Sequence, residues 1–355
     1  MLRSFDDAYY PNIMVRPAEM QALKELPENV KDSIFPIIKL CPWTTAKEFK
    51  NTHDKIIEVL DERPIICDLD DYYSSDKDRP AISQFYQARN SIDAWVEMIV
   101  NNPSYIPCVR MHGYSIGQIE NQIRNFHSLE RGFALKFDVR RLYDYERIVN
   151  LLEGQFSNIP ASEYCVIVDA GVIEKADISE ASVLNVVRKF IGIVGLRIII
   201  SSASFPSAFT KHHEITREEI KSRILFANIL RSTNYEYLSY SDWGSTKPRN
   251  EAQGGSGIVI PRIDYPIPSF WVTSRNRDEG WNYNIAAQKM MTSEFWKNAP
   301  NVWGVGKIME TAAGSPNGIS NPRQNTSARI NIHLFVQNYY GSDAGSITTD
   351  EAWED

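Results

Sequence analysis

Eight apolar segments, separated by helical patterns, constrain the fold of this sequence more than any other feature. Each segment is apolar on consecutive residues instead of alternating, which is typical of strands buried on both faces of a parallel sheet. The segments occupy residues 9–15, 34–40, 64–67, 105–112, 133–140, 164–169, 196–202 and 238–243. Their recurrence at roughly 30-residue intervals predicts a (β/α)8, TIM-like barrel rather than an open doubly wound sheet. The open sheet has less support because no glycine-rich dinucleotide turn follows the first segment.

The chain is longer than a minimal barrel. It has 355 residues, whereas a single barrel usually takes ~250 and passes ~400 only with insertions. The repeat stops near Lys247, and the sequence beyond it is rich in Trp, Tyr, Asn and Pro after Gly254-Gly255-Ser256-Gly257. We therefore predict a barrel over residues 1–247, an α+β extension packed on it over 248–342, and an acidic, mobile tail over 343–355.

Further local patterns predict particular elements. Apolar residues at three- and four-residue spacing indicate one helix from Ile82 to Val100. Glu218 and Glu219 suit the first turn of a helix that begins at Thr216. In the extension we expect strands at 258–261 and 269–273, a helix at 283–296, and a last strand at 330–336, Ile-Asn-Ile-His-Leu-Phe-Val.

Charge and cysteine usage exclude several protein classes. The net charge of −7 disfavours general DNA binding, which needs a basic surface. The four cysteines lie in apolar segments without CxxC spacing, so we expect buried reduced thiols rather than a zinc site or disulfides. No apolar run reaches the ~18 residues of a membrane helix, and acids stand where a signal peptide would be apolar. The sequence therefore predicts a cytoplasmic protein with no membrane partner.

Ionisable residues stand at the carboxyl ends of most of the eight segments. In a barrel these ends meet at one face, where the active sites of known barrel enzymes lie. The candidates are Lys39, Asp68, Asp70, Arg110, His112, Lys136, Asp138, Arg140, Asp169 and Asp242. Two interpretations stay open, because buried charges must be paired: a structural ion-pair network, or a functional pocket of mixed charge.

If the pocket is functional, its residue types suit a phosphate-bearing ligand such as a nucleotide. Lys39, Arg110 and Lys136 would hold the anion, because ammonium and guanidinium groups pair with phosphate oxygens. Asp70, Arg140 and Asp169 would also contact the ligand, although Asp169 before Ala170-Gly171 could instead cap a local turn.

The same pocket supplies candidate catalytic residues. Asp68, Asp138 and Asp242 could act as acid and base in phosphate-ester hydrolysis, or hold a divalent metal whose identity the sequence does not specify. His112 is the best placed general acid/base, because the ordinary pKa of histidine lies near neutrality. A lone histidine at a strand end can equally be structural. His333, within an apolar segment, is expected to be a core residue.

The extension carries a second set of candidates. Trp271, Arg275, Arg277, Trp281 and Tyr283 could form a face that binds a partner through stacking. The alternative is an apolar seam that holds the extension to the barrel. Both interpretations stay open at this point.

Several short motifs resemble the phage-named "beta protein" family of bacteria, phages and mobile elements. They are Tyr10-Pro11-Asn12-Ile13, Ile34-Phe35-Pro36-Ile37-Ile38, Ala203-Ser204-Phe205-Pro206, Ser241-Asp242, Gly314-Ser315-Pro316 and Asn331-Ile332-His333-Leu334. The sequence departs from the family at Lys39, where family members often carry an acid, and at Pro322-Arg323. The resemblance implies a barrel-like fold and an association with phage–host conflict, but no established reaction.

These observations lead to one hypothesis and its rivals. The first is a defence-associated barrel protein whose mouth recognises a phosphate-bearing ligand and hydrolyses it if the pocket is catalytic. The main rival is a non-catalytic binding or scaffold protein that engages a phage or host protein through the extension. A weaker third possibility is a phage-encoded accessory protein.

Overall fold

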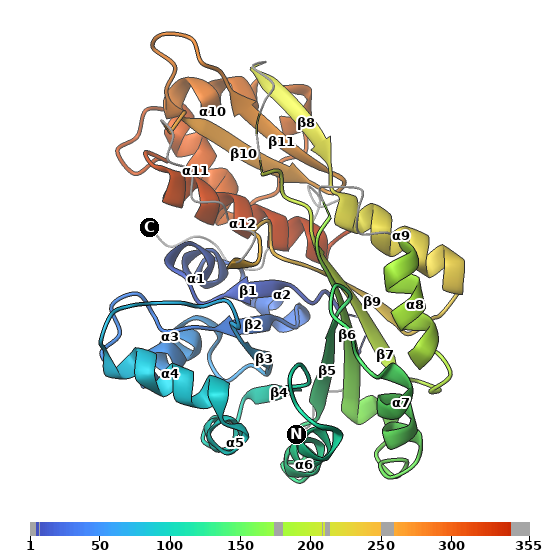
Figure 1. The fold of residues 1–355 in the computed structure, drawn as a ribbon. Coiled ribbons are helices and arrows are strands. Elements are labelled where there is room, and N and C mark those ends of the chain that lie inside the picture. The colour runs from blue at the N-terminus through green and yellow to red at the C-terminus, as the bar shows by residue number, and fades with distance from the viewer. Residues whose placement is uncertain are drawn as a thin grey trace.

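A nearly closed barrel of eight parallel strands forms the body of the molecule (Figure 1). The computed structural model describes residues 5, 6, 8–173, 180–207, 209, 214–249 and 259–341. The strands are β1 (Asn12–Met14), β2 (Ile37–Leu40), β3 (Ile65–Leu69), β4 (Tyr105–Val109), β5 (Phe133–Asp138), β6 (Tyr164–Val172), β7 (Arg197–Ala203) and β9 (Leu238–Asp242). A hydrogen bond from Tyr10 N to Tyr240 O, 3.1 Å long, joins the first strand region to the last. The predicted (β/α)8, TIM-like fold is confirmed.

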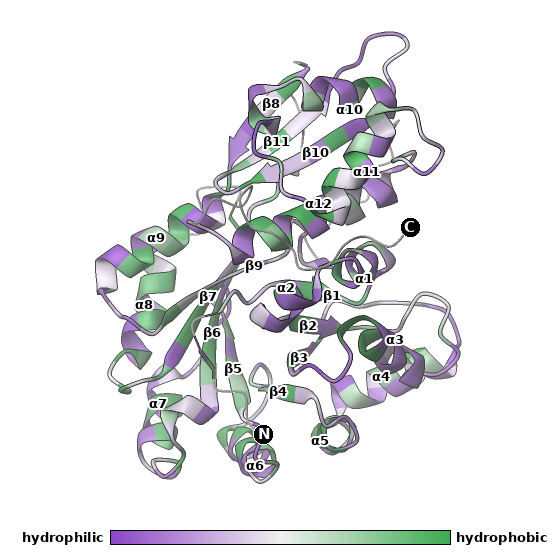
Figure 2. Cartoon of the chain, turned by 180° about the vertical axis from the view of Figure 1, so that it is seen from behind, coloured by the Kyte–Doolittle hydropathy of each residue, from purple (hydrophilic) through white to green (hydrophobic). Residues whose placement is uncertain are grey.

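The strands are apolar because both of their faces are covered. Side chains of one parity fill the barrel interior, where Ile37, Ile66, Ala134, Ile167 and Ile199 form one buried cluster. Side chains of the other parity pack outward beneath the helices in a larger cluster. Figure 2 shows the apolar character of β6 and β7 over much of their length. The interior parity decides which residues reach the barrel mouth.

Helices surround the strands. They are α1 (Pro17–Lys24), α2 (Glu28–Ser33), α3 (Lys50–Leu60), α4 (Pro80–Asn90), α5 (Ile92–Val100), α6 (Ile116–His127), α7 (Tyr145–Glu153), α8 (Glu180–Phe190) and α9 (Lys221–Thr233). The single helix expected from Ile82 to Val100 is wrong, because the segment is broken at Ser91. The Ser91 side chain accepts a hydrogen bond from Ala94 N and so begins α5 as its N-cap.

The extension is built around a three-stranded antiparallel sheet in the order β10-β11-β8. These strands are β10 (Arg262–Ile267), β11 (Phe270–Arg275) and β8 (Ile215–Glu219), and α10 (Tyr283–Met291), the 3-10 turn at Glu294–Trp296 and α11 (Trp303–Ala312) follow. The helix expected from Thr216 is wrong: residues 215–219 pair with β11, and the helix α9 begins only at Lys221. The predicted strand at 258–261 falls partly outside the described residues, and β10 begins at Arg262.

The last helix returns the chain to the barrel. The strand expected at 330–336 is wrong, because these residues lie within α12 (Pro322–Asn338). On α12, Asn331 Nδ2 donates to Ala22 O of α1 at 3.0 Å, and Gln337 Oε1 accepts from Arg223 Nε of α9 at 2.6 Å. The helix therefore takes the position of the eighth barrel helix, between α9 and α1.

This arrangement attaches the extension at the carboxyl-end face of the barrel. The β8 strand interrupts the connection from β7 to α9, and β10 to α11 interrupt the connection from β9 to α12. The contacts of β8 and α12 thus cross the predicted boundary at residue 247. The predicted tail, 343–355, lies outside the described residues. Within the described residues, no helix is both long and apolar enough to cross a membrane.

Candidate functional site

A cavity of about 80 Å³ lies at the carboxyl ends of the barrel strands. Its wall contains six basic residues: Lys39, Arg110, Lys136, Arg140, Arg141 and Arg249. It also contains five acidic residues: Asp68, Asp70, Asp71, Asp138 and Asp169. Six positive minus five negative charges leave a net charge of +1 in a chain whose formal charge is −7. The mouth therefore carries a small excess of cations in an otherwise acidic chain.

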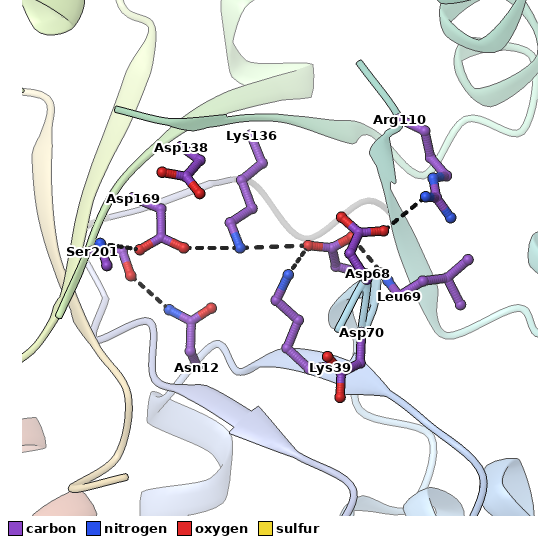
Figure 3. Close-up of polar contacts among 12 residues, drawn as sticks. Asn12, Lys39, Asp68, Leu69, Asp70, Arg110, Lys136, Asp138, Asp169 and Ser201 are labelled. Carbon is purple, nitrogen blue, oxygen red and sulfur yellow. Dashed lines mark hydrogen bonds and ion pairs between the residues drawn. The ribbon is translucent and has the colours of Figure 1, made fainter. Parts of the chain in front are cut away.

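Strand parity brings the central residues together. Side chains two residues apart on a strand share a face. Ile37 and Ile66 belong to the interior cluster, so Lys39 and Asp68 stand above them on the same face. By the same rule Lys136 and Asp169 stand above Ala134 and Ile167. Figure 3 shows these side chains converging from β2, β3, β5 and β6.

The four side chains form a chain of alternating charge. Lys39 Nζ contacts Asp68 Oδ2, and Lys136 Nζ lies 3.6 Å from the same oxygen and 3.0 Å from Asp169 Oδ2. Burial alone would raise the pKa of Asp68, but Lys39 and Lys136 lower that pKa to about 2. Burial opposes the charge on Lys136 as well, yet Asp169 and Asp68 hold its pKa well above the usual value. Asp68 and Lys136 are therefore both ionised at neutral pH.

Asp169 pairs with Lys136 and also shapes a local turn, as its alternative interpretation expected. One carboxylate oxygen pairs with Lys136, and the other accepts a hydrogen bond from Gly171 N at 3.0 Å. Gly171 has φ +66°, and a Cβ at this position would lie 2.6 Å from Arg140 Cζ. The turn that Asp169 shapes thus leaves room for the Arg140 guanidinium.

Asp138 is held by arginines. Its two oxygens accept from Arg140 Nε and Arg140 Nη2, each at 2.8 Å, and Arg141 Nε lies 3.7 Å away. Burial raises the pKa of Asp138, but the hydrogen bonds and charge of Arg140 reverse this effect and lower it. Asp138 is therefore an ionised acceptor whose lone pairs are largely occupied.

Asp70 pairs with a residue from far along the chain. Arg249 Nε donates to Asp70 Oδ2 at 2.6 Å, and Arg249 Cζ lies 5.1 Å from the centre of the Tyr73 ring. Burial lowers the pKa of Arg249, but Asp70 raises it above the ordinary value. The segment after β9 is thereby fastened to the loop after β3.

Arg110 is paired with a more exposed carboxylate than Lys136 and Arg249 are. Its guanidinium nitrogen Nη2 donates to Asp71 Oδ1 at 2.8 Å. The other terminal nitrogen, Nη1, is buried and has no hydrogen-bond partner among the described residues. The Asp71 side chain is 43% exposed, whereas those of Asp169 and Asp70 are only 5% and 4% exposed. Solvent screens an exposed pair, so the Arg110–Asp71 pair is the one that an incoming anion could displace at the lowest cost.

A second donor without an acceptor lies in the same wall. The indole Nε1 of Trp243 is buried and has no partner among the described residues. A buried N–H group without an acceptor costs roughly 1–3 kcal/mol. Arg110 and Trp243 therefore give the wall a surplus of donors, which favours a ligand rich in acceptor oxygens.

Aromatic and imidazole side chains form the outer part of the cavity. Tyr72, His112 and Tyr143 line it, and Arg141 Nη2 donates to the Tyr72 hydroxyl at 2.9 Å. The rings of His112 and Tyr143 meet edge to face with centroids 6.4 Å apart. His112 makes no side-chain hydrogen bond within the described residues, unlike the three predicted catalytic aspartates.

The site does not present a metal-binding donor set. Among the described residues, no three His, Cys, Asp or Glu side chains converge in a way that would hold a metal ion. The carboxylates of the mouth are instead engaged by lysine and arginine. The donor set therefore does not fit the divalent metal considered from the sequence.

Asp242 is not part of the mouth. Its carboxylate accepts from the Tyr9 and Tyr240 hydroxyls at 2.6 and 2.8 Å, from His333 Nε2 at 2.7 Å and from Gly244 N at 2.9 Å. These residues, called here the junction cluster, lie between β9 and α12. Burial would raise the pKa of Asp242, but His333, Tyr9 and Gly244 lower it to about 2.

Asp242 was expected to line the cavity with the other aspartates, but its side chain lies on the outer face of β9. Ser241 pairs in register with Ser201, and both hydroxyls accept hydrogen bonds from the fully buried Asn12 amide inside the barrel. Asp242 is one residue further and so faces outward, toward α12. His333 is buried as expected, although in a helix instead of a strand.

Sequence reasoning missed several residues of the wall. They are Asp71, Tyr72, Arg141, Tyr143, Trp243 and Arg249. All lie in loops after the strand ends, where no periodicity reports side-chain direction. The Arg-Arg pair at 140–141 and the Tyr-Tyr pair at 72–73 were the available signals, since each begins two or three residues after a strand end in sequence.

The aromatic residues of the extension do not form one face. Trp271 is buried, its Nε1 donates to Ser204 O at 3.1 Å, and its ring stacks on His333 at 4.6 Å. It belongs to the seam between the extension and the barrel. Trp281 instead borders a groove of about 580 Å³ with Arg275 and Arg277.

Comparison with known proteins identifies the family. The family model described as Beta protein matches residues 9–338. The chain belongs to the Beta protein family. A curated relative in this family, Protein beta of Enterobacteria phage P4, is 27% identical over 342 residues, which cover 93% of this chain and 92% of the phage protein.

A structural search also returned a solved barrel enzyme. It is D-psicose 3-epimerase from Clostridium cellulolyticum H10 with D-tagatose, 10% identical, with a TM-score of 0.33 over 65% of this chain and 84% of the epimerase.

Proposed function

We propose that this Beta protein family member binds a phosphate-bearing small molecule, such as a nucleotide, at the barrel mouth. The observation that carries the proposal is a cavity with more cations than carboxylates in which Arg110 is held only by an exposed partner. A phosphate group can replace Asp71 on Arg110 without leaving a buried carboxylate unpaired. The other mouth cations contribute mainly through their field, which a low-dielectric wall strengthens.

The size of the cavity supports binding through the phosphate end. Pockets that enclose a drug-sized ligand usually measure ~300–1,000 Å³, whereas this cavity measures about 80 Å³. One phosphate-sized group would fill it, and the remainder of the ligand would rest at the rim. Tyr72, His112 and Tyr143 offer ring faces and edges there for a planar base.

Hydrolysis of the bound ester is the reaction that we propose to test. His112 is the candidate general acid/base because its imidazole lines the cavity and makes no side-chain hydrogen bond within the described residues. Asp68 and Asp138 would stabilise the cations that hold the phosphate, since both are ionised and paired. Lys39, Lys136, Arg140, Asp70 and Asp169 would complete the wall.

Calorimetric titration with AMP and adenosine tests the binding proposal. We expect AMP to bind and adenosine, which lacks the phosphate, to bind at least roughly tenfold more weakly, as loss of charge-assisted hydrogen bonds would cause. Arg110→Ala should weaken AMP binding by a similar factor. The matched control is Arg124→Ala, since Arg124 lies on the exposed face of α6 and pairs with Glu120.

Equal affinities for AMP and adenosine would refute the proposal, as would equal losses in the two arginine variants. Phosphate release from AMP, compared between wild type and His112→Gln, then separates catalysis from binding. Release by the wild type that is lost in His112→Gln would support hydrolysis. Binding without release would leave the protein as a receptor for the ligand.

We also propose that this binding serves phage–host conflict. The support is the relative encoded by Enterobacteria phage P4, which aligns over nearly the whole chain. Cells that express the wild type should give fewer phage plaques than cells that express Arg110→Ala. Equal plaque counts for both strains and for the empty vector would reject this role.

A second candidate function rests on the extension groove. The groove is lined in part by Val259, which is 61% exposed, and by Arg275, Arg277 and Trp281. Trp281 Nε1 donates to Pro261 O at 2.9 Å, so the indole is fixed at the groove edge. A protein partner with acidic and apolar side chains would suit this surface. Pull-downs from infected cells with wild type and Trp281→Ala should differ, and identical partner sets would count against it.

A further inference from the structure

Helix α6 carries one glutamine, Gln122, on a buried face that is otherwise apolar. The buried face of α6 consists of Ile119, Gln122, Ile123 and Phe126, and Gln122 is fully buried among these apolar residues. An amide in such surroundings destabilises the fold unless its hydrogen bonds are made. The partners of Gln122 therefore explain its presence.

The two shortest hydrogen bonds of Gln122 go to backbone groups of Arg110, and a longer one, from Nε2 to Gln118 O at 3.4 Å, stays within α6. Gln122 Oε1 accepts from Arg110 N at 2.9 Å, and Gln122 Nε2 donates to Arg110 O at 2.9 Å. The donor and acceptor assignment is unambiguous, because an N–H needs the oxygen and a carbonyl needs the amide nitrogen. The side chain thus reproduces the pair of hydrogen bonds that a neighbouring strand would supply.

The hydrogen bonds between Gln122 and the Arg110 backbone form where the barrel sheet ends. The pairing of β4 with β3 reaches Pro107, and its pairing with β5 reaches Val109. Arg110 is the first residue beyond both ladders, and its side chain enters the mouth while Gly113, with φ +82°, turns the chain away. The Gln122 amide therefore fixes the backbone of Arg110, the residue just beyond the end of β4, whose guanidinium is paired with an exposed carboxylate.

We propose that Gln122 is a positioning residue for the mouth, which fixes the Arg110 backbone so that the guanidinium meets the phosphate of the ligand. The proposal rests on the proposed function, because it concerns the same site. Gln122 does not touch the ligand. Its effect passes through Arg110, where displacement of a binding group by about 1 Å can cost up to ~100-fold.

A double-mutant cycle on AMP affinity tests this coupling. Gln122→Met keeps the length of the side chain and removes both of its hydrogen bonds to Arg110. In the wild-type background we expect it to weaken AMP binding roughly tenfold. In the Arg110→Ala background the same change should alter Kd by less than about twofold, because the group that Gln122 positions is gone.

The control separates positioning from general loss of packing. Ile123→Ala removes a fully buried side chain from the next position of the same helix. It should lower the unfolding free energy but leave AMP affinity within about twofold of wild type. If Gln122→Met does not fold, Gln122→Asn replaces it, since the shorter amide cannot reach both backbone groups.

Each outcome is decisive. Absence of AMP binding by the wild type would overturn both the proposed function and this inference. Weaker binding in Arg110→Ala, with unchanged binding in Gln122→Met, would overturn the inference alone. Equal losses from Gln122→Met with and without Arg110, or an equal loss from Ile123→Ala, would assign Gln122 a merely structural role.

Discussion

The mouth and the junction cluster each have an aspartate near the end of a barrel strand, partly buried at Asp68 and buried at Asp242, yet they differ in what surrounds it. Asp68 and Asp242 each have a pKa of about 2. Asp68 is paired with lysines beside a cavity, whereas Asp242 is surrounded by hydroxyls, an imidazole and a backbone N–H beneath α12. A carboxylate at a strand end is therefore not by itself a sign of function.

The difference follows from one step of strand parity. Asp68 lies two residues beyond the interior residue Ile66, while Asp242 lies one residue beyond the interior residue Ser241. A shift of one residue moves a side chain to the opposite face of a sheet. Inner-face charges reach the cavity, and outer-face charges meet the helices.

The largest effect is expected at the junction cluster. Asp242→Ala would leave the Tyr9 and Tyr240 hydroxyls and His333 without their acceptor in a sealed interior. We expect the unfolding free energy to fall by roughly 3–5 kcal/mol, measured by urea denaturation. A loss below about 1 kcal/mol would show that the cluster does not hold α12 to the barrel.

Lys136→Met should combine a stability loss with a binding loss. It leaves Asp169 and Asp68 with less compensation, but the Lys136 side chain retains 14% exposure. We therefore expect a loss of roughly 2–3 kcal/mol, smaller than for a sealed pair. AMP affinity should fall as well, which distinguishes the mouth from the junction. Unchanged affinity in the folded variant would break this distinction.

The inner-face residues could be predicted from the sequence, and the exceptions have physical causes. Asp68, Lys136 and Asp169 follow apolar segments whose strands form as expected. The Ile-Asn-Ile-His-Leu segment at 330–334 alternates like a strand, but its Asn331 and His333 are buried polar residues with tertiary partners on a helix. Asn321 before Pro322 was the overlooked signal, because that pair is typical of a helix start.

The edge strand β8 and the loop residue Arg249 could not be placed from local sequence patterns. Residues 215–219 become a strand because β11 offers them a partner more than fifty residues away in sequence order, a tertiary effect that outweighs the local signals of a helix start. Arg249 reaches Asp70 across the mouth from a segment with no periodicity. Gln122 could have been recognised from the sequence, because it is a polar residue on an otherwise apolar helix face.

Acid should destabilise both regions. The pKa values of Asp68 and Asp242 fall from 3.8 to about 2 on folding, so their contribution is present above about pH 4 and is lost as the pH falls through 2. Each would contribute about 2 kcal/mol. Unfolding measured between pH 5 and 2 should show this decline, and Asp242→Asn should flatten it. An unchanged slope in Asp242→Asn would contradict the ionised junction.

The smallest effect is expected at the rim of the mouth. Asp71→Asn removes the exposed partner of Arg110, so stability should change by less than about 1 kcal/mol. AMP affinity should rise by about two- to threefold, because a competitor for Arg110 is gone. Weaker binding in this variant would show that Asp71 supports the ligand instead of competing with it.

The most direct test of the anion site is a crystal structure of the protein with AMP. The proposal predicts the phosphate in the mouth, with its oxygens bonded to the Arg110 guanidinium and Asp71 displaced from it. The junction cluster should remain closed and unchanged. A phosphate bound elsewhere, or a mouth in which Arg110 and Asp71 stay paired at saturating AMP, would contradict the proposed site.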